Sequence, residues 1–126
     1  MEYRIVIEEH AGQRMLHTYI VGQLYEKERD RISAETIQTL CDSKVHKTIW
    51  DVREAQLRYS LTKIHMSVVN AEAAGLKPQN YVAVIYKNNE REYEHAKLVT
   101  QSRAMHNLEY FQNIDEGINW LADKQY

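Results

Sequence analysis

Two segments near the start of the chain alternate apolar and polar residues in the manner of β-strands. In the first, Tyr3, Ile5 and Ile7 alternate with other residues, and in the second, Met15–Ile20, residues with high β-propensity dominate. Gly12 lies between them. Alternation with a period of two indicates a strand with one buried face, so the pattern predicts a β-hairpin.

After this hairpin the pattern changes repeatedly between helical and strand periods. The continuous apolar run Tyr81–Tyr86 is typical of a strand covered by helices on both faces, and we predict that it is the central strand. The predicted elements, in chain order, are a helix from Ser33 to about Cys41, a strand over Val45–Val52, a helix over 61–74, the strand Tyr81–Tyr86, a helix from Asn88 or Asn89 to about Arg103, a strand over Leu108–Phe111 and a helix after Asn113. The charged stretch Glu26–Arg31 extends the first helix as a looser turn.

Residues that favour helix ends support these boundaries. Ser33 can accept a free backbone N–H at the start of its helix, and Asn113 and Glu116 have the spacing of a capping box. Gly75 followed by Pro78 is a typical stop for the helix over 61–74.

Three successive units of strand and helix after Lys44 favour right-handed crossovers and a largely parallel sheet. The predicted fold is a mixed α/β sheet of about five strands with an N-terminal β-hairpin and about four helices. We expect residues 1–126 to form a single domain.

Composition narrows the class of protein. The 126 residues are 44% hydrophobic and 27% charged, which is typical of a folded, soluble domain with no integral membrane segment. The net charge of -2 argues against nucleic acid as a partner, because general nucleic-acid binders usually carry a basic excess.

The single cysteine and the N-terminal segment indicate the compartment. Cys41 cannot form an internal disulfide, and residues 1–30 carry charges throughout, without the apolar core of a signal peptide. We expect a cytoplasmic protein. Because Cys41 follows Leu40 at the end of a helical pattern, we predict that its thiol is buried as a small hydrophobe.

The order of elements, with the segment Ile49–Ala55 and the serine-initiated helix after it, resembles the STAS or SpoIIAA-like domains along nearly the whole chain. Small bacterial stand-alone proteins of that superfamily are most similar. They share an early Gly22, an Asp-x-Arg like Asp51-Val-Arg53, and an ending like Phe111-x-x-x-Asp115-Glu-Gly-Ile-x-Trp120-Leu121. The resemblance implies a STAS fold, which is shared with CRAL-TRIO-like lipid carriers.

The same resemblance points to Ser60. In the anti-sigma-factor antagonists of the superfamily, a serine at a helix start after the strand-end acid is phosphorylated by a partner kinase. If Asp51 is aligned with that acid, Ser60 takes the place of the serine, while Tyr59 and Thr62 replace the acid and the glycine of the motif. A phosphate at a helix N-terminus meets free N–H groups. The alternative is that Ser60 is only an N-cap.

Polar residues follow the predicted parallel strands, whose carboxyl ends should meet at one rim. The candidate rim residues are Asp51, Arg53, Glu54, Lys87, Asn88, Asn89 and Asn113. In open α/β sheets this rim usually binds ligands and partners. The alternative is that Asp51 and Arg53 form a local salt bridge and that the asparagines only cap the following helices.

Recognisable catalytic and metal-binding motifs are absent from the sequence. The six histidines fall on separate predicted elements, without the spacing of a metal motif, so we predict no metal site and no cofactor. There is no nucleophile elbow, phosphate loop or dinucleotide fingerprint, and we predict that the protein is not an enzyme.

The aromatic residues leave two functions open. Nine tyrosines and two tryptophans accompany one phenylalanine, and such amphipathic rings are enriched at binding surfaces. We expect a non-catalytic regulatory module that binds a protein partner. The alternative is a carrier or sensor of a small apolar or anionic ligand, with tyrosines such as Tyr59, Tyr86 and Tyr93 lining a cleft. Self-association as a homodimer is a further alternative.

Overall fold

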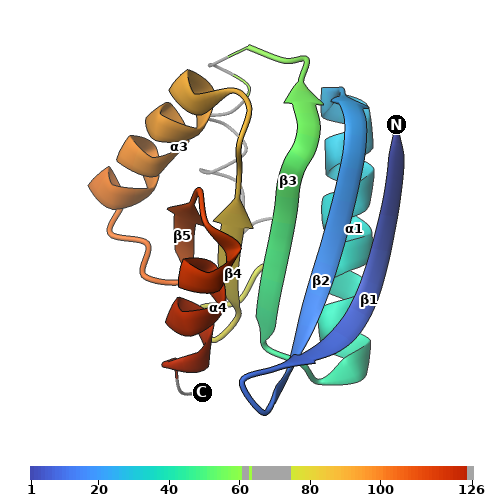
Figure 1. Cartoon of the computed structure of the whole chain (residues 1–126), viewed down its shortest axis with the longest axis vertical. Helices are drawn as coiled ribbons and strands as arrows, with labels where there is room; N and C mark the ends of the chain where they lie inside the picture. Colours follow the sequence, from blue (N-terminus) through green and yellow to red (C-terminus); the bar gives the residue numbers. More distant parts are fainter. Residues whose placement is uncertain (61–62, 64–74, 125–126) are drawn as a thin grey trace.

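Five strands form one mixed sheet in the computed structural model, which describes residues 1–60, 63 and 75–124 (Figure 1). They are β1 (Glu2–His10), β2 (Gln13–Leu24), β3 (Lys47–Leu57), β4 (Tyr81–Ile85) and β5 (Leu108–Phe111), and they lie side by side in sequence order. β1 and β2 form the predicted antiparallel hairpin, and β2 to β5 are parallel. The described helices are α1 (Glu26–Ser43), α3 (Glu90–Ser102) and α4 (Ile114–Ala122). The helix predicted over 61–74 lies outside the described residues.

The described helices cover the two faces of the sheet unequally. Figure 1 shows α4 in front of β4, on what we call the front face, and α1 behind β2, on the back face. α1 and α3 share one hydrophobic cluster with the back of the sheet, through residues such as Ile32 and Tyr93, whereas Leu121 of α4 packs on Ala83 and Ile85. No described helix lies over the front of β1 and β2 (Figure 1).

β4 has the buried character that its sequence predicts, but it is not the central strand. Ala83 and Ile85 face α4, while Val84 packs with the α3 side chains, so helices cover both faces as expected. The central position belongs to β3, which pairs with β2 on one side and β4 on the other. The prediction was wrong because an apolar strand sequence indicates only that helices cover both faces of the strand. It does not indicate how many strands lie on either side of it in the sheet.

β3 extends beyond its predicted end at Val52 and includes Arg53 and Glu54. The cause is a bulge: Tyr19 pairs with Asp51, but Val21 pairs with Glu54, so β3 has one more residue than β2 between these pairs. Such an extra residue interrupts the alternation of inward and outward side chains. The polar pair therefore looks like the end of a strand in the sequence, although the strand runs on to Leu57.

α1 begins at Glu26, so the stretch Glu26–Arg31, which was predicted to extend the helix as a looser turn, is regular helix, and its N-cap is Tyr25 and not Ser33. Its buried stripe starts with Arg29, whose guanidinium lies 4.9 Å above the centre of the Tyr59 ring. A charged residue in this position makes the buried side of the helix hard to recognise from the sequence. The apolar stem of an arginine can pack against the core while its charged head group keeps polar contacts.

Cys41 is exposed, which contradicts the prediction of a buried thiol. The buried stripe of α1 continues through Ile32, Thr36 and Leu40. The residue after Leu40 is rotated by about 100° around the helix axis and leaves the buried side.

The C-terminal part of the chain agrees closely with prediction. β5 covers Leu108–Phe111, and the N-cap of α4 is Asn113, whose side chain accepts hydrogen bonds from the backbone N–H groups of Asp115 and Glu116. Within the described residues, no helix combines the length and the apolar character needed to cross a bilayer.

Candidate functional site

The loop after β4 is bound to the end of β3 through two of the candidate rim residues. Asn88 Nδ2 donates to the carbonyl oxygens of Arg53 and Ala55, both at 3.3 Å, and Asn89 Oδ1 accepts the Leu57 N–H at 2.9 Å. β4 pairs with β3 only as far as Asp51, so within the described part of the chain the later part of β3 has no partner strand on that side. The asparagine side chains take the place of the missing strand.

Other candidate residues at this rim are exposed or serve as caps. The Glu54 and Lys87 side chains are exposed, although Glu54 itself pairs with Val21 of β2 in the sheet. Asn113 lies beyond β5, and its side chain is engaged in capping α4. Asn89 precedes α3 in a left-handed conformation and makes no side-chain cap, because its side chain reaches β3.

Ser60 is exposed in the loop that follows β3. Its Oγ accepts the Lys63 N–H at 3.4 Å, a contact of the type that N-cap residues make. Two residues earlier, the exposed Arg58 donates to Gln23 Oε1 at 2.7 Å and to Gln56 Oε1 at 3.0 Å. The Ser60 hydroxyl is therefore accessible, and its surroundings are held by side-chain hydrogen bonds.

Together these loops form a surface beyond the carboxyl ends of β2, β3 and β4 (Figure 1). Tyr25 follows β2 and is 50% exposed, which is unusual for a large aromatic side chain in this structure. We call this surface the rim surface and define it by five exposed residues, which are Tyr25, Arg58, Ser60, Lys87 and Asn88.

Asp51 does not lie on the rim surface. It is within β3, is only 5% exposed, and its side chain belongs to the front face of the sheet. Arg53 lies two residues further along the same face and holds the carboxylate through Nε at 2.9 Å and Nη2 at 2.7 Å. The local salt bridge that was one interpretation of this pair is therefore present, between a buried carboxylate and a partly exposed guanidinium.

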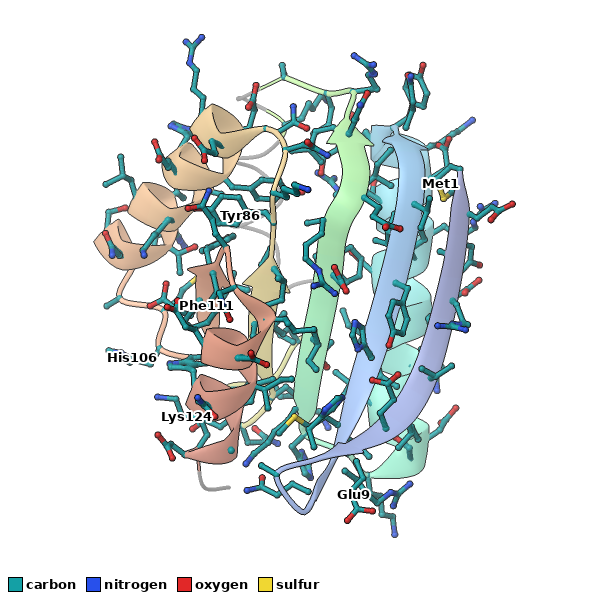
Figure 2. All side chains as sticks on the ribbon, viewed as in Figure 1. Met1, Glu9, Tyr86, His106, Phe111 and Lys124 are labelled. Carbon is teal, nitrogen blue, oxygen red and sulfur yellow. The ribbon has the colours of Figure 1, made fainter. Side chains whose placement is uncertain are left out.

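The salt bridge is one end of a larger cluster on the front of β1, β2 and β3. His17 Nε2 lies 2.9 Å from Asp51 Oδ2, and His17 Nδ1 lies 2.8 Å from Glu8 Oε1. Glu8 Oε1 is also 2.9 Å from His10 Nε2, and its Oε2 accepts the Tyr19 hydroxyl at 2.5 Å. We call this cluster the His17 network; it consists of Glu8, His10, His17, Tyr19, Asp51 and Arg53. Figure 2 shows side chains on this part of the sheet with no helix in front of them.

Aromatic stacking holds the buried histidine in place. The His17 and Tyr19 rings are stacked, with centroids 3.6 Å apart and planes inclined by 9°. The Arg4 guanidinium lies 4.5 Å from the centre of the Tyr19 ring. The orientation of the His17 imidazole is thus set by a stacked ring as well as by the two carboxylates.

The hydrogen bonds of the network shift the pKa values of its acids. Burial opposes the ionisation of Glu8, but hydrogen bonds from Tyr19, His10 and His17 outweigh it and lower the pKa of Glu8 to about 2. Burial likewise opposes ionisation of Asp51, yet hydrogen bonds from His17 and Arg53 hold its pKa well below the usual range. Burial and the Glu8 carboxylate raise the pKa of Tyr19 to about 12. At neutral pH the network therefore holds two carboxylates and a neutral phenol.

Among the described residues, three side chains in this network have the geometry of metal ligands. One ligand atom each from Glu8, His10 and His17 lies within 4.8 Å of the other two. The arrangement can hold a cation or a proton between these groups. Tyr19 is not an activated nucleophile, because its raised pKa keeps the phenol protonated.

The sequence analysis identified Asp51 and Arg53 but missed Glu8, His10, His17 and Tyr19. The two histidines belong to strands that pair with each other, since His10 pairs with Gln13 and Val6 with His17. A usable signal was present: Glu8 and His10 share one face of a strand, and so do His17 and Tyr19. The hairpin register then places these pairs diagonally across the two strands.

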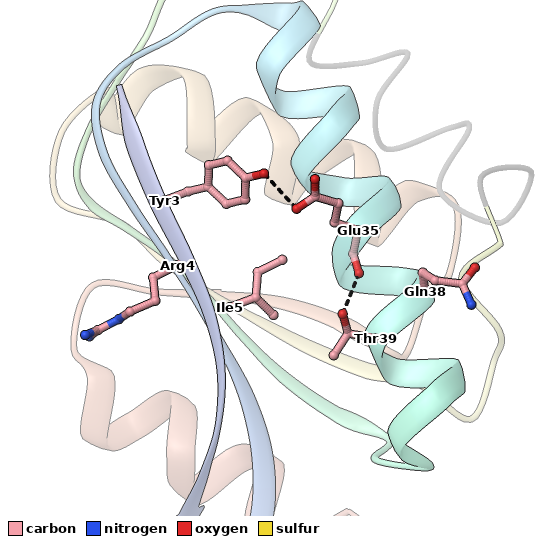
Figure 3. A pocket seen from close by; sticks show the side chains of 6 residues that line it. All are labelled: Tyr3, Arg4, Ile5, Glu35, Gln38 and Thr39. Carbon is pink, nitrogen blue, oxygen red and sulfur yellow. Dashed lines mark hydrogen bonds between the residues drawn. The ribbon is translucent and has the colours of Figure 1, made fainter.

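A shallow groove of about 520 Å³ lies at the back of the sheet between β1 and α1 (Figure 3). Tyr3 donates its hydroxyl hydrogen to Glu35 Oε2 at 2.7 Å across this groove, and Thr39 donates to the Glu35 carbonyl oxygen at 2.8 Å. Arg4, Ile5 and Gln38 also line it, and the Arg4 side chain points away from the groove (Figure 3). More of the lining is polar than apolar.

Comparison with solved structures identifies the fold. An uncharacterised protein from Shewanella loihica with a SpoIIAA-like fold superimposes with a TM-score of 0.57 and 20% identity, over 94% of this chain and 93% of that protein. An anti-sigma factor antagonist from Mycobacterium paratuberculosis gives a TM-score of 0.61 and 12% identity, over 97% and 96% of the two chains. SpoIIAA in its unphosphorylated form gives 0.51 and 11%, over 96% and 100%. This chain is similar to all three in fold.

Sequence comparison adds nothing to this assignment, because neither a family model nor a curated protein sequence matches the chain.

Proposed function

We propose that this chain, whose fold is SpoIIAA-like, is a non-catalytic regulatory module that binds a protein partner in the cytoplasm through the rim surface. The observation that carries the proposal is that the rim surface is exposed while two of its five residues, Arg58 and Asn88, are held in place. Arg58 is fixed by Gln23 and Gln56, and the Asn88 amide is fixed on β3. A surface that is already ordered loses little side-chain entropy when a partner binds.

The residue types on the rim surface suit protein recognition. Tyrosine and arginine are enriched among the residues that contribute most to protein interfaces, and Tyr25 and Arg58 are both exposed here. Arg58 and Lys87 offer the rim surface positive charges that can pair with acidic residues of a partner.

The structural neighbours support the same function. Two of them are described as SpoIIAA and an anti-sigma factor antagonist, a class defined by its action on another protein. SpoIIAA is described in its unphosphorylated form, which implies that it also has a phosphorylated form. As part of the proposal, we transfer to this chain both the action on another protein and the control by phosphorylation.

Ser60 is the residue at which phosphorylation would regulate the partner. Its hydroxyl is exposed, and it lies near Arg58 in the chain. A phosphoryl group would add a charge of about -1.5 to -2 beside Arg58 and would repel the acidic residues of a partner. We therefore expect the unphosphorylated chain to be the form that binds.

The carrier alternative has less support from the described residues. Tyr86 and Tyr93 are stacked in the packed core, with centroids 5.0 Å apart, and do not line a cleft. The groove between β1 and α1 has a mostly polar lining, whereas sites for apolar ligands are predominantly apolar.

A binding experiment with surface variants tests the proposal. The immobilised wild-type chain is used to isolate its partner from the native host, and the affinity of that partner is then measured for Tyr25→Ala, Arg58→Ala and Ser60→Glu. We expect each variant to weaken binding at least about tenfold, as residues central to an interface do. Arg103→Ala is the matched control, because Arg103 is exposed at the opposite end of α3.

The outcome is decisive in either direction. Equal affinity of the wild type and the three rim variants, or equal losses for Arg103→Ala, would exclude the rim surface as the binding site. Ser60→Ala should bind like the wild type if only added charge is inhibitory.

A further inference from the structure

We propose that Glu8, His10 and His17 form a binding site for a divalent transition-metal ion of the Zn²⁺ type. The site lies on the front of the β1–β2 hairpin, among residues that do not belong to the rim surface, so it stands independently of the proposed partner binding. Its ligand atoms are Glu8 Oε1, His10 Nε2 and His17 Nδ1.

The spacing of these atoms is close to that of a metal site. Glu8 Oε1 lies 2.9 Å from His10 Nε2 and 2.8 Å from His17 Nδ1, and all three atoms lie within 4.8 Å of one another. A tetrahedral Zn²⁺ ion with bonds of about 2.0–2.2 Å separates its ligand atoms by about 3.4 Å. Rotations that move each atom by a few tenths of an ångström to about 1 Å would therefore make room for the ion.

The hydrogen bonding of His17 calls for positive charge at this position. Both ring nitrogens of His17 face a carboxylate oxygen, Nδ1 toward Glu8 and Nε2 toward Asp51. A neutral imidazole has only one N–H, so it can donate to one of these carboxylates but not to both. A metal ion on Nδ1 would satisfy both sides, because Nε2 could then donate its single hydrogen to Asp51 while Glu8 Oε1 coordinates the ion. The Arg53 guanidinium is bound to Asp51, whereas the ion-pair contacts of Glu8 among the described residues are with His10 and His17.

The structure contains hydrogen-bonding side chains of the kind that commonly orient metal ligands. A metal-bound histidine usually donates its other N–H to a carboxylate, and His17 Nε2 meets Asp51 at 2.9 Å. Arg53 holds that carboxylate in turn with two N–H groups. Tyr19 donates to Glu8 Oε2, which leaves Glu8 Oε1 for the ion. The side chains around the three ligands thus have the orientation that metal binding requires.

The site can be reached from solvent, and its ligand atoms determine which class of ion it would bind. The His10 and Glu8 side chains are 27% and 29% exposed, while His17 is 2% exposed, so an ion would enter from the His10 side and keep a position open to water. Two imidazole nitrogens and one carboxylate oxygen are a usual ligand set for Zn²⁺. Mg²⁺ and Ca²⁺ prefer oxygen ligands, so they should bind far more weakly.

Titration of the purified full-length chain with ZnCl₂ and CoCl₂ tests the site, with calorimetry for Zn²⁺ and visible absorption for Co²⁺. We expect one ion per chain, with MgCl₂ giving no saturable binding. His10→Ala should weaken Zn²⁺ binding more than about 100-fold, since even the loss of an outer partner costs about 10–100-fold. His10 lies at the edge of the network and is partly exposed, so this variant should fold.

Two further variants separate a built site from incidental binding to surface histidines. His106→Ala, which removes an exposed histidine outside the network, should bind Zn²⁺ like the wild type. Tyr19→Phe keeps the stacked ring but removes the hydrogen bond to Glu8, and it should weaken binding about tenfold.

The proposal is overturned if the wild type fails to bind Zn²⁺ or Co²⁺ stoichiometrically. It is equally overturned if His10→Ala binds with wild-type affinity. Imidazole ¹⁵N spectra give an independent readout: metal binding should change the His17 Nδ1 signal selectively and leave Nε2 protonated toward Asp51.

Discussion

His17 and Asp51 lie on neighbouring parallel strands and meet on the front of the sheet, with His17 Nε2 2.9 Å from Asp51 Oδ2. Only 2% of the His17 side chain and 7% of the Asp51 side chain are exposed. Arg53 satisfies the same carboxylate from the side nearer to solvent. Charged groups in such a setting depend on one another, because each would be costly to bury alone.

Removal of the Asp51 carboxylate should therefore destabilise the fold. For Asp51→Ala we expect a loss of about 2–3 kcal/mol in the free energy of unfolding, because the buried His17 ring and the partly exposed Arg53 lose the carboxylate to which they are hydrogen-bonded. Urea unfolding followed by circular dichroism measures it. Glu54→Ala, which removes an exposed acid from the same strand, should change stability by less than about 0.5 kcal/mol. Similar values for the two variants would show that the buried pair contributes no special stability.

The Asn113 side chain should contribute to the stability of α4. It accepts the Asp115 N–H at 2.8 Å and the Glu116 N–H at 3.3 Å, and loss of such a cap typically costs about 1 kcal/mol. We expect Asn113→Ala to lose that amount in chemical denaturation. Asn119→Ala changes an exposed asparagine inside the same helix and should be neutral or slightly stabilising, because alanine favours helix. A neutral Asn113→Ala would contradict the capping role.

Leu121 and Leu98 provide a matched test of how α4 and α3 pack. Leu121 is fully buried against Ala83 and Ile85, whereas Leu98 is 65% exposed on α3. Leu121→Ala should cost about 2–5 kcal/mol, since it removes buried methyl groups and leaves a cavity. Leu98→Ala should cost less than about 0.5 kcal/mol. Thermal or urea unfolding of both variants measures the difference. Comparable losses would contradict either the packing of Leu121 on β4 or the exposure of Leu98 on α3.

Tyr110 should make the fold sensitive to alkaline pH. Burial raises the pKa of Tyr110 to about 12, despite a contact of its hydroxyl with Thr100 Oγ1 at 3.3 Å. In the unfolded chain a tyrosine ionises near pH 10. The stabilising effect of the neutral phenol is therefore complete below pH 10 and is lost between about pH 10 and 12. One pKa unit corresponds to about 1.4 kcal/mol, so the total loss is about 2–3 kcal/mol.

Urea unfolding at several pH values measures this loss, and Tyr110→Phe is the control. The variant should lose about 2–3 kcal/mol less than the wild type over the same pH range. The buried Tyr93, whose pKa burial also raises, should leave part of the decline in place. Identical slopes for wild type and variant would show that Tyr110 ionises equally in both states.

Sequence patterns predict the C-terminal half of the fold well, because local signals and tertiary packing agree there. The apolar run of β4 lies between two helical layers, and the Asn113 cap lies where α4 begins. The patterns are less informative where a charged residue is part of the core. Arg29 makes the buried side of the first turns of α1 hard to recognise in the sequence. The bulge near Arg53 likewise makes the second half of β3 hard to recognise as strand.

The candidate sites divide in the same way. The Asp51–Arg53 ion pair is local, so the alternation of a single strand places both side chains on one face. The remaining members of the His17 network come from two other strands, and their meeting depends on the registers of β1 with β2 and of β2 with β3. A shift of either register by one residue would turn the side chains of that strand to the opposite face.

The amino-acid sequence alone determines the kinds of elements, their order and most of their boundaries, because period and capping act over a few neighbouring residues. It also determines that Ser60 follows β3 and that polar residues follow β4 and β5. Only the tertiary structure decides that β3 is central, that Asp51 is buried, and that Glu8, His10 and His17 converge on one point. The physical reason is that strand pairing joins residues far apart in sequence, and its register depends on packing across the whole sheet.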